Sequence, residues 1–139
     1  MTSRWQAEKS AVAGTARVMS QMGLVTGTSG NVSVRFSPSE TGEPLVAVTP
    51  AATAYSTMQA DDIVVTDFEV DPIDSDLTPS SESLMHVAIY RARPDVGAVI
   101  HTHSVYSSVL AVSGLDIPPV LDEVIVNIGG AIRVSEDGF

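Results

Sequence analysis

The segment PSSESLMHVAIYRARPDVGAVIHTHS, residues 79–104, predicts a helix followed by a strand and contains all three histidines of the chain. Two serines directly after Pro79 are good helix N-caps, and apolar residues then recur at helical spacing. The turn RPDVG (93–97) leads into an apolar run that is typical of a buried strand over 98–103. The segment therefore places polar residues at the start of a helix and at the end of a strand.

The flanking sequence predicts further helices alternating with short strands. Small and apolar residues recur at helical spacing over 4–22, and Gly23 is suited to end that helix in the left-handed conformation. Another helix is expected over 105–112. Further strands are expected from Val32 and over 45–49, 63–66, 120–128 and 129–134. Because hairpin signals occur beside helices, the expected fold class is α/β, with helices packed on the faces of a mixed sheet.

The composition excludes several classes of protein. The 139 residues are 44% hydrophobic, which is enough for one globular domain over 1–139. A net charge of −10, with seven Lys and Arg, argues against a nucleic-acid partner or an anionic membrane partner. Any phosphate must then be bound locally, by backbone N–H groups and hydroxyls.

The lack of cysteine, of a secretory signal and of a membrane span narrows the expected location of the protein. The chain has no cysteine, which rules out disulfides and thiolate metal sites. Residues 1–10 lack the apolar stretch of a secretory signal, and no apolar run reaches the length of a membrane span. A soluble cytoplasmic protein without a membrane partner is expected.

The tripeptide His101-Thr102-His103 is the sharpest candidate for a metal site. Side chains alternate along a strand, so both imidazoles would point to one face, close enough to share an ion. Imidazole is a common ligand of zinc and other late first-row divalent metals. Two ordinary polar residues at a strand end would show the same spacing, and the tripeptide alone leaves both interpretations open.

The start of the predicted helix is a candidate anion site. Ser80, Ser81 and Glu82 lie where free N–H groups and hydroxyls form a cradle for an oxyanion or a phosphate. The same serines can equally be plain caps, and Glu82 can simply complement the helix dipole. His86 follows Glu82 by four residues on the same helical face, a spacing at which the pair could bind a metal. No H-E-x-x-H motif is present, however, and a structural role is expected for His86.

The loop GTSGN (27–31) is a second candidate anion site. Its glycines permit close backbone approach, and the Asn31 amide can donate to a phosphate. It has neither the spacing of a dinucleotide-binding loop nor the lysine of a P-loop. Most such loops are only turns.

Together these motifs resemble those of the class II aldolase and adducin family. The matching stretches are GTSGNVSVR (27–35), VTP (48–50), residues 79–104 and IPPVLDEVIVNIGG (117–130). The combination of G-N-x-S, S-S-E and H-x-H at these separations is far more specific than each motif alone. Within the family, the chain is most similar to L-fuculose-phosphate aldolase and its relatives, which include L-ribulose-5-phosphate 4-epimerase.

The resemblance implies a fold and a reaction. The family fold is a mixed, largely antiparallel sheet between helical layers (αβα), usually assembled as a homotetramer with active sites at subunit interfaces. The reaction is zinc-dependent cleavage of a small, fuculose-phosphate-like ketose 1-phosphate to dihydroxyacetone phosphate and an aldehyde, through an enediolate. Another divalent metal could take the place of zinc.

The resemblance also implies roles for individual residues. Glu82 would be the catalytic acid/base and would also ligate the metal when substrate is absent. The zinc ligands beside it would be His101 and His103. The residues implied to hold the phosphate of the substrate are Gly30, Asn31, Ser80 and Ser81.

Three positions depart from the family pattern. The family's zinc site uses a further histidine downstream of H-x-H, and none follows before Phe139, so the chain is expected to lack the C-terminal part of its domain. Ala51-Ala52 stands where relatives commonly have Thr/Ser-Gly, which removes a hydroxyl for the phosphate. Asp122 stands where fuculose-phosphate aldolase has a tyrosine that assists proton transfer.

Two alternative functions are consistent with the same motifs. A sugar-phosphate 4-epimerase uses the same retro-aldol step and rejoins the fragments. A non-catalytic binding module, like the head of adducin, keeps the fold without the metal chemistry. The intact H-x-H and S-S-E motifs argue against the second alternative.

Overall fold

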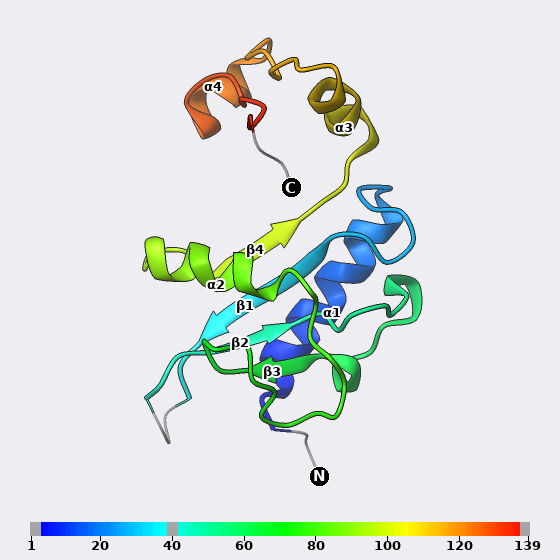
Figure 1. Ribbon diagram of the computed structural model, residues 1–139, viewed down its shortest axis with the longest axis vertical. Coiled ribbons are helices and arrows are strands. Elements are labelled where there is room, and N and C mark those ends of the chain that lie inside the picture. The colour runs from blue at the N-terminus through cyan, green and yellow to red at the C-terminus, as the bar shows by residue number, and fades with distance from the viewer. Residues whose placement is uncertain (1–3, 39–41, 137–139) are drawn as a thin grey trace. The chain divides into compact units, whose positions relative to one another are not determined.

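Residues 4–38 and 42–136 are described by a computed structural model of the chain (Figure 1). The chain divides into two units between Thr102 and His103. Among the described residues, the first unit contains the sheet, two α-helices, two short 3₁₀ helices and both hydrophobic cores. The described residues of the second unit form two short α-helices.

A four-stranded antiparallel sheet forms the centre of the first unit. Its strands are β1 (Asn31–Phe36), β2 (Leu45–Val48), β3 (Val64–Thr66) and β4 (Ala98–His101), in the order β3-β2-β1-β4. β1 pairs with β2 on one side and with β4 on the other. In the second pairing, Asn31 lies opposite His101, so the start of β1 meets the end of β4.

Two helices cover opposite faces of this sheet (Figure 1). One core joins α1 (Gln6–Gln21) to strand residues that include Ala47 and Val65. The other joins α2 (Ser83–Ala92) to Val46, Val48 and Val64. Side chains alternate along a strand, so neighbouring residues belong to different cores. The predicted α/β fold class is confirmed for this unit.

Two short 3₁₀ helices link β2 to β3. They are η1 (Tyr55–Thr57) and η2 (Ala60–Asp62), and both pack against α1. Tyr55 is buried in the α1 core, and the side chain of Met58 between the two helices is fully buried there. This linker therefore contributes two large buried side chains to the α1 core.

A pairing outside the named strands fixes the approach to α2. Pro50 and Pro79 form an isolated antiparallel bridge, and the Ser80 N–H donates to the Thr49 carbonyl at 3.1 Å. The segment before α2 is thereby anchored at the end of β2. The helix begins at Ser83, later than predicted, because the Ser83 N–H closes a turn onto the Ser80 carbonyl at 3.0 Å.

The strand predicted over 98–103 differs from the observed one in length and burial. β4 ends at His101, and its residues alternate between exposed and half-buried. It lies at the end of the described sheet order, with β1 as its partner. The apolar run therefore indicated a strand correctly but overestimated its burial, because a run of this kind does not show whether a strand is central or terminal.

The second unit corrects another strand prediction. Its helices are α3 (Val105–Val112), as expected, and α4 (Asp122–Ile128), where a strand was predicted. Two acidic residues in the first turn of α4 suit a helix N-terminus, and Gly129 ends the helix in the left-handed conformation at φ 93°. The strand expected over 129–134 is reduced to a bridge between Ile132 and Ile117.

No helix in the described part of the chain has the length and apolar character needed to span a membrane.

The turn after β2 allows the left-handed backbone conformation of Ala52 to be tested. Ala52 is exposed and has a left-handed φ of 54°. Ala52→Gly should stabilise the fold by up to about 1 kcal/mol, because the Cβ strain disappears without loss of a buried contact. The matched control Ala51→Gly, at a position without positive φ, should instead cost about 0.5 kcal/mol by adding freedom to the unfolded chain. Urea unfolding measures both changes, and a destabilising Ala52→Gly would contradict the turn geometry.

Candidate active site

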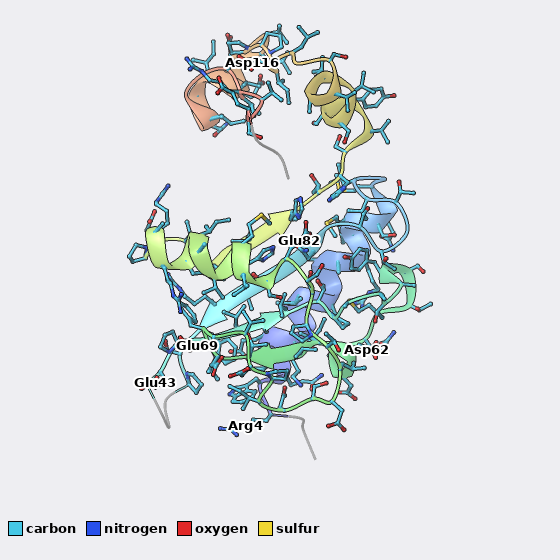
Figure 2. The ribbon with its side chains drawn as sticks, in the orientation of Figure 1. Arg4, Glu43, Asp62, Glu69, Glu82 and Asp116 are labelled. Atoms are coloured by element: carbon cyan, nitrogen blue, oxygen red, sulfur yellow. The ribbon has the colours of Figure 1, made fainter. Side chains whose placement is uncertain are left out.

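Three side chains able to hold a metal converge near the end of β4. One ligand atom each from Glu82, His101 and His103 lies within 4.8 Å of the others. Glu82 is the N-cap residue of α2 and is labelled in Figure 2, close to β4. The Nδ1–H of His101 donates to Oε2 of Glu82 at 3.0 Å. Residues 19 positions apart in the chain are thus brought into direct contact.

The chemistry of this donor set fits a late first-row divalent cation. Two imidazoles and a carboxylate are the ligand types that zinc accepts, and three protein ligands are typical of a zinc site with a position left for substrate or water. Glu82 and His101 are half-buried and His103 is exposed, which lets an ion enter from solvent. His103 lies beyond the last residue of β4, so strand alternation alone does not place it.

Asn31 joins the phosphate-site candidates to this group. Its Nδ2 donates to Oε2 of Glu82 at 2.5 Å and to Oγ of Ser80 at 2.8 Å. The side chain is buried, with 1% of its surface exposed. The structure therefore gathers Asn31, Ser80, Glu82 and His101 at one place, whereas Ser81 is exposed in the turn before α2.

Gly30 permits the close approach of the 27–31 loop to β4. Its φ is +74°, and a Cβ built on it would lie 2.5 Å from the carbonyl oxygen of His101 and 2.7 Å from Val25. The Tyr55 hydroxyl donates to the Gly30 carbonyl. The pKa of Tyr55 is raised above its ordinary value, mainly by burial; a hydrogen bond with Thr49 lowers it, and the Glu82 charge raises it further. Glycine is thus required at this position by the backbone conformation and by the space available.

Behind Asn31 lies a chain of buried polar side chains that the sequence motifs did not reveal. The Asn31 Oδ1 is 2.5 Å from Nε2 of His86, and Nδ1 of His86 is 2.6 Å from Oγ of Ser33. Ser33 in turn lies 2.7 Å from the Tyr90 hydroxyl. The structural role expected for His86 agrees with its complete burial.

The sequence does contain a signal for this series of hydrogen-bonded side chains, in the alternation of β1. Asn31, Ser33 and Arg35 are spaced by two, as polar residues on one face of a strand. His86 and Tyr90 are spaced by four, as neighbours on one face of a helix. Recognising that these two polar faces meet required knowing that α2 packs on β1, which only the tertiary structure shows.

Burial also changes the protonation of His86. Desolvation lowers its pKa from 6.5 to about 4, the nearby imidazole of His101 lowers it as well, and the Glu82 carboxylate raises it. The ring is therefore neutral in the folded chain at neutral pH. A neutral imidazole has one N–H donor and one acceptor nitrogen.

Comparison with known proteins identifies the family. The model of the class II aldolase and adducin N-terminal domain matches residues 10–138. The chain belongs to the class II aldolase and adducin family. It is 46% identical over 106 residues to the 5-methylthioribulose-1-phosphate/5-deoxyribulose-1-phosphate aldolase of Escherichia coli O45:K1 (strain S88 / ExPEC). That match covers 76% of this chain and 46% of the relative, so the chain spans about half the length of the curated relative it matches.

Solved structures of family members share the fold. An L-fuculose 1-phosphate aldolase superimposes with a TM-score of 0.75 at 31% identity, over 91% of this chain and 57% of that one. The L-fuculose 1-phosphate aldolase of Glaciozyma antarctica PI12 gives 0.76 at 22% identity, over 89% and 51%. The second likeness shows the fold alone. The family resemblance inferred from the motifs is confirmed.

The Gly30 contact predicts a specific defect. Gly30→Ala should destabilise the fold by more than about 2 kcal/mol, since left-handed strain adds to a clash with the His101 carbonyl. Gly27→Ala is the matched control, because Gly27 has a φ of +63° but no atom within 4 Å of the added Cβ. It should show the strain alone, about 1 kcal/mol. Equal losses in thermal or urea unfolding would contradict the close approach.

His86 predicts a pH dependence of stability. Between its ordinary pKa of 6.5 and the folded value of about 4, the unfolded chain binds more protons than the folded one. The contribution of His86 to the free energy of unfolding is thus fully present above pH 6.5. It declines as the pH falls toward 4, by on the order of 3 kcal/mol in total. The free energy of unfolding, measured in urea at about pH 7.5 and at about pH 5, should change less between the two pH values in His86→Gln than in the native chain. The same difference in both chains would refute this assignment.

Proposed function

We propose that the chain supplies the metal and phosphate sites of a metal-dependent aldolase that cleaves a small ketose 1-phosphate. The products are dihydroxyacetone phosphate and an aldehyde. The observation that carries the proposal is the convergence of Glu82, His101 and His103, with ligand atoms within 4.8 Å, beside the Asn31 and Ser80 pair. Zinc is the proposed ion, and other late first-row divalent ions suit the same ligands.

The relatives narrow the proposed substrate. The 46% identical protein is a methylthioribulose- and deoxyribulose-phosphate aldolase, and the 31% identical structure is a fuculose-phosphate aldolase. The names of these substrates share a ketose that carries a 1-phosphate. We therefore propose a ketose 1-phosphate whose far end lacks a terminal hydroxyl, with 5-deoxyribulose 1-phosphate as the first compound to test.

The residues of the site would divide the chemistry between them. A bound divalent cation would supply Lewis acidity at the substrate oxygens next to the bond that breaks. Glu82 would move a proton on and off the substrate carbon that becomes electron-rich after the C–C bond breaks. Donors from Asn31 and His101 hold its Oε2, so the carboxylate has a defined orientation before substrate binds. His101 and His103 would hold the cation.

The phosphate would be held away from the breaking bond. Gly30, Asn31, Ser80 and Ser81 are the proposed residues of the phosphate site. Ser81 is exposed in the turn before α2 and would donate to a phosphate directly. Both amide hydrogens of Asn31 go to Glu82 and Ser80, so Asn31 would act by orienting the Ser80 hydroxyl. Local donors of this kind suit a chain of net charge −10, which provides no long-range attraction for a phosphate. Binding at this remote group fixes the geometry of the reacting atoms.

Replacement of Glu82 is the direct test. Glu82→Gln should reduce the release of dihydroxyacetone phosphate from 5-deoxyribulose 1-phosphate by at least about 100-fold, because the proton carrier is lost while the side-chain size is kept. Glu43→Gln is the matched control, since Glu43 is exposed and far from Glu82 in Figure 2. A coupled enzymatic assay for the product measures both, with and without a chelator to remove the metal. Cleavage that survives both Glu82→Gln and the chelator would refute the proposal.

A further inference from the structure

The hydrogen-bond chain behind Glu82 has a direction that can be deduced from its chemistry. Five side chains follow one another, from Glu82 through Asn31, His86 and Ser33 to Tyr90, each within 2.7 Å of the next. His86 is fully buried, and Asn31 and Ser33 are each 1% exposed. Water cannot therefore substitute for a missing partner, and each link needs one donor and one acceptor.

The carboxylate sets the orientation of the Asn31 amide. An ionised Glu82 only accepts hydrogen bonds, so the group 2.5 Å from its Oε2 has to be the NH₂ of Asn31. The second hydrogen of that NH₂ is directed to Oγ of Ser80 at 2.8 Å. The Oδ1 of Asn31 consequently faces His86 and requires a donor there.

The orientation of Asn31 then fixes the tautomer of His86. Nε2 has to carry the proton that is donated to Asn31 Oδ1, which leaves Nδ1 of the neutral ring as an acceptor. The Ser33 hydroxyl donates to Nδ1, and its oxygen accepts from the Tyr90 hydroxyl. Every link is satisfied in this one direction. The reverse direction would place the Asn31 oxygen 2.5 Å from the carboxylate, two acceptors without a hydrogen between them.

We propose that His86 is a positioning residue: as the Nε2–H tautomer it locks the Asn31 amide in the orientation that holds the Glu82 carboxylate at the metal site. The inference rests on the proposed function in treating Glu82 as the catalytic and metal-binding carboxylate. His86 reaches neither metal nor substrate in this role. It acts through Asn31, whose amide would otherwise turn over and present its oxygen to Glu82.

The tautomer can be measured directly in the native chain. Long-range ¹H–¹⁵N correlation spectra of histidine-labelled protein distinguish protonated from unprotonated ring nitrogens. The chain has three histidines, so His101→Gln and His103→Gln identify the His86 signals by elimination. We expect a protonated Nε2 and an unprotonated Nδ1 at neutral pH. The opposite tautomer, or a ring protonated on both nitrogens, would overturn the proposal.

Two substitutions separate positioning from packing. The amide nitrogen of His86→Gln reaches roughly the place of Nε2 and can still donate to Asn31. The side chain of His86→Asn reaches only the place of Nδ1, keeps an acceptor for Ser33 and loses that donor. Zinc affinity, measured by competition with a chelating dye well below the melting temperature, should stay within about threefold of native in the Gln variant. It should fall by at least about tenfold in the Asn variant.

The outcomes of these experiments distinguish a failure of the positioning role of His86 from a failure of the proposed function. Equal zinc affinity in two folded variants would show that His86 only packs, and would overturn the positioning role even if both melt earlier. A native chain that binds no zinc would refute the proposed function. The tautomer spectrum would still decide the direction of the hydrogen bonds between Glu82 and Tyr90. If neither variant folds, the spectrum of the native chain remains the deciding measurement.

Discussion

The burial of a polar strand face against a polar helix face is the constraint on which the site depends. β1 presents Asn31 and Ser33 to α2, and α2 presents His86 and Tyr90 in return. Unpaired buried polar groups would cost about 1–3 kcal/mol each, so these side chains must find one another with donors matched to acceptors. In the described part of the chain, no buried side-chain nitrogen or oxygen lacks a partner. The chain of pairs ends at Glu82, and the fold thus delivers a carboxylate in a fixed orientation.

The remaining features of the site follow from how this strand and helix begin. β1 starts where β4 ends, which sets Asn31 opposite His101. α2 starts after a turn anchored on β2 by the Pro50 and Pro79 bridge, which sets Ser80 and Glu82 beside them. The site therefore forms where a strand start, a strand end and a helix start coincide. Such places are rich in hydrogen-bonding groups that helices and strands leave without partners.

The sequence motifs predicted most of the candidate site, since each has a chemical signature of its own. H-x-H and S-S-E pointed to His101, His103 and Glu82, and the structure brings all three together. They did not reveal the roles of Ser33 and Tyr90, because serine and tyrosine in a strand and a helix are common and carry no motif. Periodicity also mistook α4 for a strand, since a short apolar run fits either element and its acidic first turn was the better guide.

The sequence by itself determined the family and the fold class and predicted the candidate ligand residues, because spacing, alternation and residue chemistry are local properties of the chain. The tertiary structure decided which polar faces meet, how deeply β4 is covered and why Gly30 must lack a side chain. Those facts depend on contacts between residues about 20 to 70 positions apart, and no local pattern specifies such a contact. The orientation of Glu82 is of this second kind. It arises from the packing of α2 on β1, through an asparagine and a histidine that the motifs alone could not connect.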